Sequence, residues 1–441
     1  MQLDQILAWL NATEPSEPSG SGVSTAGSYH DKHNGGGQQR RPDNDETLRT
    51  RRSKIGSAAS TPSSGLSYDP FASSQSPAPQ RSGRPSPEKQ LRRLQLHPEG
   101  LDVRELATFR GMPEELETML DRIAAFSDGK GIVPPAVQGA LAEAAASDRA
   151  FRWALRGSDH VSDDPAMTAA CTPAPKDVRD ALDAALECST HSHNEANWIM
   201  QVHAQILRMA FQPGGNPKYI HLVNPVACID ASFLASHGIT KLSKEGDFCI
   251  YMNPEHAGSS SMFSSAVQRA RAAFPHGILS FEELAPLYDR LVVLSMGTNL
   301  GERFEAARLQ LGLWEMARWA FLRRWHMPGA APTGPVVGVT GLVDTIETSD
   351  MQQIALKILP SFLPSIIIQG HDWWLFVATG EGKRTVLWQR VLIGSTSNSR
   401  GVYQIVSALQ YLEKWVRDVR WPWVRVLLEV MELYQQGKLG N

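Results

Sequence analysis

The sequence predicts an α/β or α+β fold, preceded by a helical region and by a long segment without structure. Residues 11–90 are rich in Ser, Gly, Pro, Gln and Arg, and residues 91–188 show apolar residues at helical spacing. From about His191, helical and strand-like patterns alternate, which is the order expected of a sheet covered by helices. The expected divisions are residues 1–10, 11–90, 91–188, 189–430 and 431–441.

The first two divisions are predicted to be a short amphipathic helix and a disordered linker. Leu3, Ile6, Leu7 and Leu10 recur at helical spacing, whereas residues 11–90 have too few large apolar side chains to offset the entropy of ordering. Two basic clusters in the linker, 40–41 and 49–54, have the spacing of a bipartite nuclear import signal. A solvated basic linker is the alternative, so the protein is expected to be nuclear or cytoplasmic.

Charge argues against nucleic acid as the favoured partner. Residues 1–95 hold 12 basic and 9 acidic residues, which leaves 31 basic and 37 acidic residues beyond Gln95 and a net charge of −6 there. A domain that grips phosphates usually carries a basic excess. Nucleic-acid binding therefore requires that the basic residues gather on one face.

No membrane, secretion or zinc signal is evident. The sequence has no apolar run of about 18 residues, and its start lacks the basic-then-apolar order of a signal peptide. The four cysteines form no CxxC pair and have no regular spacing, so we expect reduced, mostly buried thiols. The protein is expected to be soluble and intracellular.

Residues 91–188 are predicted to be a helical cover without visible chemistry. The expected helices are 102–126, 135–155 and 175–188, which are rich in Ala, Leu and Glu. Pro135 and Pro175 stand near helix starts, where proline is tolerated.

The next elements carry the candidate carboxylates. Glu195 opens a predicted helix and lies on the same face as Ile199, so its carboxylate needs a cationic partner or a metal. Strands are expected at 219–230 and 247–252, and alternation places Asp247 on one face with Cys249. A strand at 290–296 and a helix at 304–314 follow.

Several phrases in order resemble the PD-(D/E)XK nuclease-like domain proteins of filamentous fungi, within the restriction-endonuclease-like superfamily. The likeness runs from Glu195 to about Trp423 and includes Trp9 and Leu10 in the opening helix. It implies a mixed central sheet flanked by helices. Its phrases are Asp247-Phe-Cys-Ile-Tyr, Leu309-Gln-Leu-Gly-Leu-Trp, Ile368-Gln-Gly-His-Asp-Trp, Gly394-Ser-Thr and Gly401-Val-Tyr-Gln-Ile-Val-Ser-Ala-Leu.

In this superfamily a helix Glu, a strand Asp and a strand Glu-x-Lys hold divalent cations that assist phosphodiester hydrolysis. The resemblance implies that Glu195 and Asp247 match the first two positions. Gln310 and Trp314 resemble the Gln-x-x-x-Tyr helix motif of the RecB-like branch, with Trp in place of Tyr.

The resemblance fails at the Glu-x-Lys strand. Gly297 stands where the metal-binding Glu is expected, and Asn299 stands where the Lys is expected. Glu195 and Asp247 alone would hold Mg²⁺ or Mn²⁺ weakly. A migrated carboxylate, Glu302 or Glu305, is the speculative third ligand.

The favoured hypothesis is a nuclease fold repurposed for binding. Its residual pocket, around Glu195, Asp247, Ser295, Asn299 and Gln310, would take a small molecule or a protein partner, with no cofactor or a weakly held Mg²⁺ or Mn²⁺. The resemblance implies an accessory role in fungal specialised metabolism. The alternatives are an active metal-dependent endonuclease and a non-catalytic nucleic-acid binding module.

Histidines give a weaker signal. The spacing of His191, His193 and His203 fits no known ligand set, so surface or supporting roles are expected. His371 and Asp372 join two apolar runs and predict a tight hairpin turn, with a pocket lining as the alternative.

Overall fold

The computed structural model describes the chain from residue 86 onward, with gaps. The described ranges are 86–164, 172–212, 221–228, 248–256, 287–300, 304–325 and 359–425, together with isolated positions between them and residue 428. The predicted opening helix and the two basic clusters lie outside these ranges. Residues 86–90, the last of the predicted linker, are described, and a helix already begins at Pro87.

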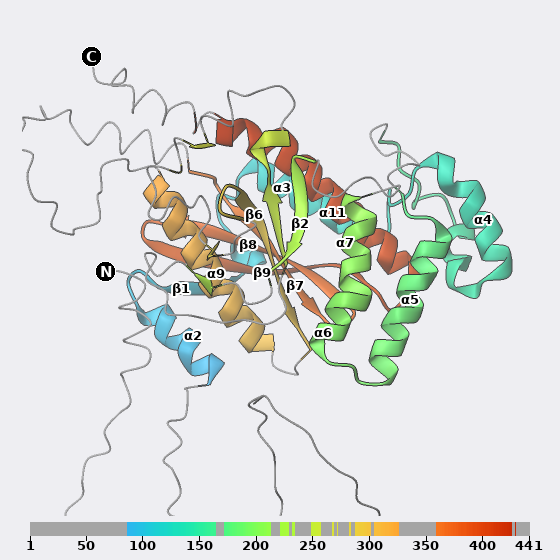
Figure 1. Ribbon diagram of the computed structural model, residues 1–441, viewed down its shortest axis with the longest axis horizontal. Coiled ribbons are helices and arrows are strands. Elements are labelled where there is room, and N and C mark those ends of the chain that lie inside the picture. The colour runs from blue at the N-terminus through green and yellow to red at the C-terminus, as the bar shows by residue number, and fades with distance from the viewer. Residues whose placement is uncertain are drawn as a thin grey trace, which may run out of the picture. The chain divides into compact units, whose positions relative to one another are not determined.

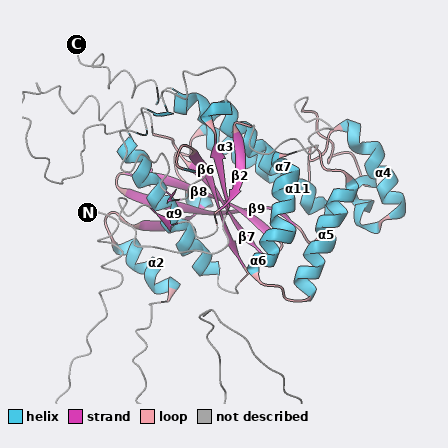
Figure 2. Ribbon diagram, viewed as in Figure 1, coloured by secondary structure: helices cyan, strands magenta, loops and turns pink. Residues whose placement is uncertain are grey.

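A seven-stranded mixed sheet forms the centre of the molecule (Figures 1 and 2). Its strand order is β1-β9-β8-β7-β6-β4-β2, and the β1/β9 and β6/β7 pairs are parallel while the other pairs are antiparallel. The predicted mixed α/β sheet is therefore confirmed. The strands are β1 (Leu101–Glu105), β2 (Val223–Ala227), β4 (Phe248–Met252), β6 (Leu291–Asn299), β7 (Leu363–Gln369), β8 (Asp372–Glu381) and β9 (Arg384–Ser395), and β3 (Ser232–Phe233) and β5 (Glu282–Glu283) form a separate pair.

Helices cover the sheet, as Figure 2 shows. The described helices are α2 (Pro87–Leu96), α3 (Glu114–Ser127), α4 (Gln138–Ser147), α5 (Pro175–Thr190), α6 (Glu195–Trp198), α7 (Ala204–Phe211), α9 (Phe304–Trp325) and α11 (Ser399–Trp415). π-Helical segments, Ile199–His203 and Val416–Arg420, follow α6 and α11. Within the parts of the chain described here, no helix combines the length and the apolar composition needed to cross a bilayer.

The helix predicted from residue 102 is wrong at its start, because residues 101–105 form β1. Leu101 is buried and pairs with Thr385, and Arg104 forms an ion pair with Glu381 of β8 at 2.7 Å. A five-residue strand offers too little alternation to stand out against helix-forming neighbours. The helix of this region, α3, begins only at Glu114.

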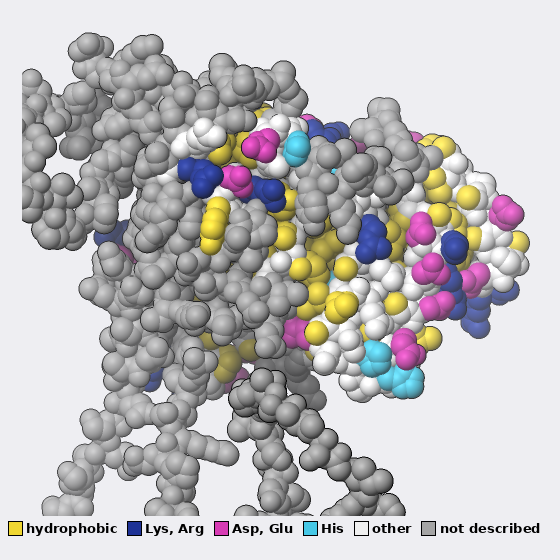
Figure 3. Space-filling view, in the orientation of Figure 1, with side chains coloured by type: hydrophobic (Ala, Val, Ile, Leu, Met, Phe, Trp, Pro, Cys, Tyr) yellow, Lys and Arg dark blue, Asp and Glu magenta, His cyan; other side chains and the backbone are white. Residues whose placement is uncertain are grey.

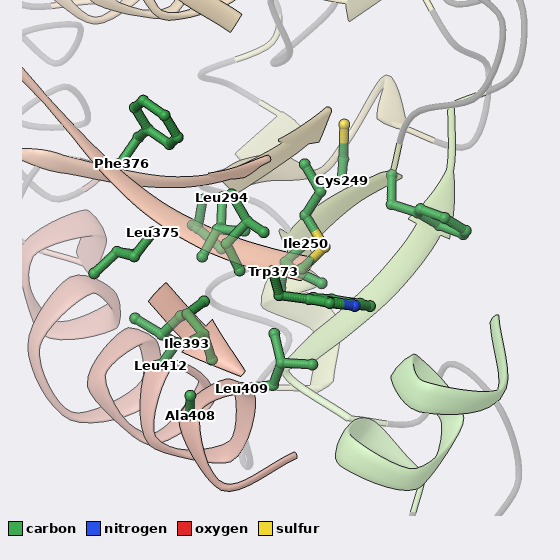
Figure 4. Packing of buried hydrophobic residues seen from close by; sticks show 14 of the residues in the cluster. Cys249, Ile250, Leu294, Trp373, Leu375, Phe376, Ile393, Ala408, Leu409 and Leu412 are labelled. Carbon is green, nitrogen blue, oxygen red and sulfur yellow. The ribbon is translucent and has the colours of Figure 1, made fainter. Parts of the chain in front are cut away.

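Buried apolar residues of the sheet form one hydrophobic core with those of α9 and α11. Asn398 caps α11 by accepting a hydrogen bond from the Gly401 N–H at 2.8 Å, and the helix then buries an apolar stripe. Figure 4 shows Leu409 and Leu412 of this stripe directed toward Trp373 and Ile393 of the sheet.

The cysteines of the described ranges agree with the sequence prediction. Cys188, Cys228 and Cys249 are free and buried, and the last two place their sulfur atoms 2.8 Å apart. Cys171 lies outside the described residues.

Strand alternation gives β6 two distinct faces. Ser295 lies toward Glu315 of α9, whereas Leu300, just past the strand, packs against Trp198 on the other side. Odd-numbered residues of β6 therefore face α9, and even-numbered residues face the α5–α7 helices.

Candidate functional site

Glu195 stands at the first turn of α6, as the sequence predicts. Asn194 caps this turn by accepting a hydrogen bond from the Asn197 N–H at 3.0 Å, and Trp198 and Ile199 are buried behind it. The half-buried Glu195 carboxylate accepts a hydrogen bond from the Thr298 hydroxyl. Thr298 is buried, so this contact anchors α6 to the end of β6.

Gly297 and Asn299 lie in regular β structure. Gly297 pairs with Ile367 and Asn299 pairs with Gln369 of the parallel strand β7. Side chains of successive strand residues leave opposite faces, so Thr298, which holds Glu195, points away from the face of Asn299. The contact between Thr298 and Glu195 is thus on the helix α6 side of β6, while positions 297 and 299 face the α9 side.

A polar row crosses four strand ends on the α9 side. Directly paired residues share a face, and the register joins Asn299 to Gln369, Gln369 to Asp372, and Asp372 to Ser395. All four side chains are half-buried. Only Asn299 of this row was expected in the residual site, although the pocket-lining alternative included Asp372. Gln369 and Asp372 belong to the phrase at 368–373, and Ser395 belongs to the phrase Gly394-Ser-Thr.

The predicted hairpin is confirmed, but its turn residues are Gly370 and His371 instead of His371 and Asp372, because Asp372 is already the first residue of β8. Gln369 pairs with Asp372 across a two-residue turn, and Gly370 has the positive φ of 56° that favours glycine at the first turn position. The turn brings the polar ends of β7 and β8 side by side. It also directs His371 toward Thr396, with 3.1 Å between His371 Nδ1 and the Thr396 hydroxyl.

The other predicted residues are spread along α9 or lie outside the described ranges. Gln310 is half-buried on α9, and Glu305 forms an ion pair with Arg308 at 3.2 Å. Asp247 and Glu302 are not among the described residues.

The donors around this strand end do not fit a divalent cation. Mg²⁺ and Mn²⁺ require several charged oxygen ligands, yet Asp372 is the only carboxylate in the polar row. Within the described ranges, no three His, Cys, Asp or Glu side chains gather in a way that could hold a metal ion. We therefore derive no metal-assisted step from these residues.

A buried aromatic and histidine cluster, which sequence reasoning missed, lies behind the hairpin turn. His203 is 1% exposed, not a surface residue, and its ring packs edge-on to Trp373 with 5.8 Å between centroids. Among the described residues, neither His203 nitrogen has a hydrogen-bond partner of ordinary geometry. Burial lowers the pKa of His203 to about 4, and the nearby Gly370 backbone offsets part of that effect. His203 is therefore neutral at physiological pH.

A cavity of about 340 Å³ opens beside the same turn. His371 forms part of its wall, so the alternative prediction of a pocket lining also holds for this residue. Its lining combines one face of α5 with the turn before α11: Ala150, Arg179, Leu182, Asp183, Leu186, Ser189, His371, Thr396, Ser397, Asn398 and Ser399. Arg179 is held by ion pairs with both Asp148 and Asp183, so its charge is already balanced.

A buried ion pair lies on the α9 side of the sheet. Arg318 and Glu315 of α9 are 2% and 0% exposed, with 3.4 Å between Arg318 Nη1 and Glu315 Oε1. Burial raises the pKa of Glu315 to about 7, against the opposing effects of Arg318 and Ser295. In the part of the chain that the structure describes, the second Glu315 oxygen and the Ser295 and Ser365 hydroxyls have no hydrogen-bond partner of ordinary geometry. Ser295 thus belongs to this interior cluster.

Comparison with known proteins identifies the family. The family model of the PD-(D/E)XK nuclease superfamily matches residues 140–421, which is more than half of the chain. The chain therefore belongs to the PD-(D/E)XK nuclease superfamily. No curated protein and no solved structure matches it. Strand β1 and helices α2 and α3 precede the matched region, yet β1 is an edge strand of the same seven-stranded sheet.

Proposed function

We propose that this member of the superfamily does not cleave nucleic acid and instead binds a small molecule or a protein partner. The observation that carries the proposal is Gly297 on the face where the Glu-x-Lys motif should present a carboxylate. Its neighbour on that face, Asn299, has no cationic group to stabilise a phosphorane. The binding site would be the 340 Å³ cavity between α5 and the turn before α11, which His371 of the β7–β8 hairpin also lines.

The distribution of charge supports a partner other than nucleic acid. Beyond Gln95 the chain has 31 basic and 37 acidic residues. On the face that Figure 3 shows, described Lys and Arg side chains are interspersed with Asp and Glu side chains and form no basic stripe. A phosphate backbone is bound mainly by clustered positive charge.

The finer placement within the superfamily is part of the same proposal. Gln310 and the buried Trp314 stand four residues apart on α9, which supports membership of the RecB-like branch. The phrases shared with proteins of filamentous fungi favour a fungal origin and an accessory role in specialised metabolism. The nuclear import signal and the disordered linker remain predictions.

A cleavage assay tests the proposal directly. The wild-type protein, Asp247→Ala and the double variant Gly297→Glu/Asn299→Lys are incubated with DNA and with RNA in Mg²⁺ or Mn²⁺. We expect no cleavage above background by the wild type, since losing a catalytic group costs on the order of 10² to 10³ in rate. Calorimetric titration with Mn²⁺ should show weaker binding by the wild type than by the double variant.

The outcomes separate the alternatives. Cleavage by the wild type that Asp247→Ala abolishes, and that the control Asp372→Asn leaves intact, would overturn the proposal and make Glu302 the third ligand to test. Cleavage by the double variant alone supports a scaffold that lost its chemistry at two positions. If no variant cleaves, the site has diverged beyond those positions, which also supports the proposal.

A further inference from the structure

One face of helix α5 forms a wall of the 340 Å³ cavity described above. The residues of this wall recur at helical spacing: Arg179, Leu182, Asp183, Leu186 and Ser189. Leu182 packs against the hydrophobic core, whereas Leu186 is 63% exposed although it lines the cavity. An apolar ligand surface that covers Leu186 is removed from water together with the leucine, which is favourable. This wall therefore suits a ligand with an apolar body.

The remaining polar lining offers groups that carry no charge. It consists of the turn residue His371 and of residues before and at the start of α11: Thr396, Ser397, Asn398 and Ser399. Burial lowers the pKa of His371 from its ordinary value of 6.5, against the opposing effects of the Asp372 charge and the Thr396 backbone, so the imidazole is mainly neutral at pH 7. Neutral imidazole, hydroxyl and amide groups can each donate and accept hydrogen bonds. Uncharged polar groups of a ligand can pair with them in either direction.

The charged groups of the lining are paired with each other. In the described lining these groups are Arg179 and Asp183. Arg179 Nε and Nη2 lie 3.2 and 3.0 Å from the two Asp183 oxygens, and Arg179 Nη1 lies 3.1 Å from Asp148 Oδ2. Every nitrogen of the guanidinium and both Asp183 oxygens are therefore engaged. A charged ligand would lose hydration without gaining an opposite charge that is not already paired.

The first turn of α11 favours a negative ligand, but the charges on α5 and at Asp148 outweigh it. A helix dipole amounts to about half an elementary charge at the N-terminus. The two carboxylates that contact Arg179 exceed its single positive charge by one, which leaves a net charge of −1. The Asn398 side chain also already accepts the Gly401 N–H of that turn. An anion is therefore disfavoured at this cavity.

We infer that the cavity binds an uncharged amphipathic small molecule. Its apolar body covers Leu182 and Leu186, and its polar group forms hydrogen bonds with the neutral side chains around His371. The inference rests on the proposed function, because it names the ligand class of the same site. The volume of 340 Å³ lies at the lower end of the range of about 300 to 1,000 Å³ for small-molecule sites, which suits one small ligand.

The test uses the full chain and three probes that share the naphthalene ring and the position of its substituent. Naphthamide is uncharged, naphthoate is an anion, and naphthylmethylammonium is a cation. Dissociation constants are measured at pH 7 by NMR titrations that observe the probe. The wild type should bind naphthamide at least about tenfold more tightly than either charged probe, because only the charged probes give up ionic hydration.

A first variant tests whether the probe lies in this cavity. Leu186→Ser removes the exposed part of the apolar wall and should weaken naphthamide binding about fivefold. Leu96→Ser is the matched control, because Leu96 is an even more exposed leucine, at 80%, and does not line the cavity. This control should bind naphthamide as the wild type does.

A second variant tests the argument from charge. Asp148→Asn/Asp183→Asn keeps the shape of both side chains but leaves Arg179 without a carboxylate partner among the described residues. Naphthoate should then bind at least as tightly as naphthamide, since the guanidinium gains a charged acceptor.

The control for this variant is Asp102→Asn/Glu381→Gln. It takes two carboxylates away from Arg104, which they hold at 2.8 and 2.7 Å outside the cavity. The control should bind naphthamide more tightly than naphthoate, as the wild type does.

The inference is overturned if the wild type binds none of the probes, or binds a charged probe as tightly as naphthamide. Equal losses in Leu186→Ser and Leu96→Ser would place the probe outside the cavity and also overturn it. Should Leu186→Ser fail to fold, the Asp148→Asn/Asp183→Asn variant decides, and an unchanged order of affinities in that variant contradicts the site.

Failure of this inference can be told apart from failure of the proposed function. A wild type that neither cleaves nucleic acid nor binds a probe contradicts only the ligand class, because a protein partner remains. Cleavage that depends on Asp247, together with tight naphthamide binding, contradicts the loss of nuclease activity and leaves the ligand class supported.

Discussion

The two faces of the sheet bury ionisable side chains in different ways. On the α7 face, His203 packs against Trp373, and neither of its nitrogens has a hydrogen-bond partner of ordinary geometry among the described residues. On the α9 face, Glu315 is fully buried but is paired with Arg318. The α7 face therefore avoids a buried charge by keeping a neutral histidine, whereas the α9 face buries a guanidinium together with a carboxyl group and backbone carbonyls that accept its hydrogen bonds. This comparison predicts opposite responses to substitution and to pH.

The largest effect is expected from Arg318→Met. The substitution removes the partner of Glu315 and the donor to the Val293 and Pro364 carbonyls, all inside the protein. Breaking a buried pair from one side costs about 3 to 5 kcal/mol in the free energy of unfolding. Urea unfolding at pH 7 measures it, with Arg390→Met as an exposed control that should change stability by less than about 1 kcal/mol. A loss no larger than the control's would show that the α9 face does not depend on this charge.

The next largest effect is on the pH dependence of the free energy of unfolding, to which the two faces should contribute with opposite sign. The pKa of Glu315 is raised from 4.5 to about 7, so its contribution to stability is fully present below pH 4.5 and is lost as pH rises toward 7. The pKa of His203 is lowered from 6.5 to about 4, so its contribution is present above pH 6.5 and is lost as pH falls toward 4. Each contribution amounts to about 3 kcal/mol.

Between pH 4.5 and 6.5 these two effects oppose each other, and single variants should expose them. Glu315→Gln leaves the histidine, so its stability should rise with pH in this window relative to the wild type. His203→Phe leaves the glutamate, so its stability should fall with pH relative to the wild type. Denaturant midpoints at several pH values provide the measurement. Parallel pH profiles for both variants and the wild type would contradict the assignment of either group.

The smallest effect concerns the contact between Thr298 and Glu195. Thr298→Val removes one hydrogen bond to a half-buried carboxylate and should cost about 1 kcal/mol. Thr298→Ser keeps the hydroxyl and serves as the control. A double-mutant cycle with Glu195→Gln isolates the interaction, and strictly additive losses would mean that the two side chains are not coupled.

Most of the sheet could be predicted from the sequence because its signals are local. The hairpin between β7 and β8 follows from the two apolar runs that His371 and Asp372 join, and α11 follows from its apolar stripe. The candidate site was harder to predict from the sequence. Which face of β6 meets Glu195 depends on packing, and the sequence alone does not reveal that Thr298 is its partner.

Buried charges were the least predictable feature, for a physical reason. Glu315 and Arg318 stand three residues apart on a helix, which is also the spacing of an ordinary exposed pair. The buried Arg420 follows Arg417 and Asp418, and such a group of charged residues predicts a solvent-exposed helix surface. In both cases burial results from strands and helices distant in the sequence, so no local pattern marks it.

Strand β1 also has a consequence for how the protein is made. Its last residue, Glu105, pairs with Gln389 of β9, 284 residues further along the chain. At a synthesis rate of about 5 to 20 residues per second, β1 leaves the ribosome about 15 to 60 seconds before its partner exists. Until β9 is made, β1 cannot pair in its final position. Until β1 then pairs with β9, β9 has an open edge that other chains can join. Closure of the sheet at this edge is therefore a late, long-range step of biosynthesis.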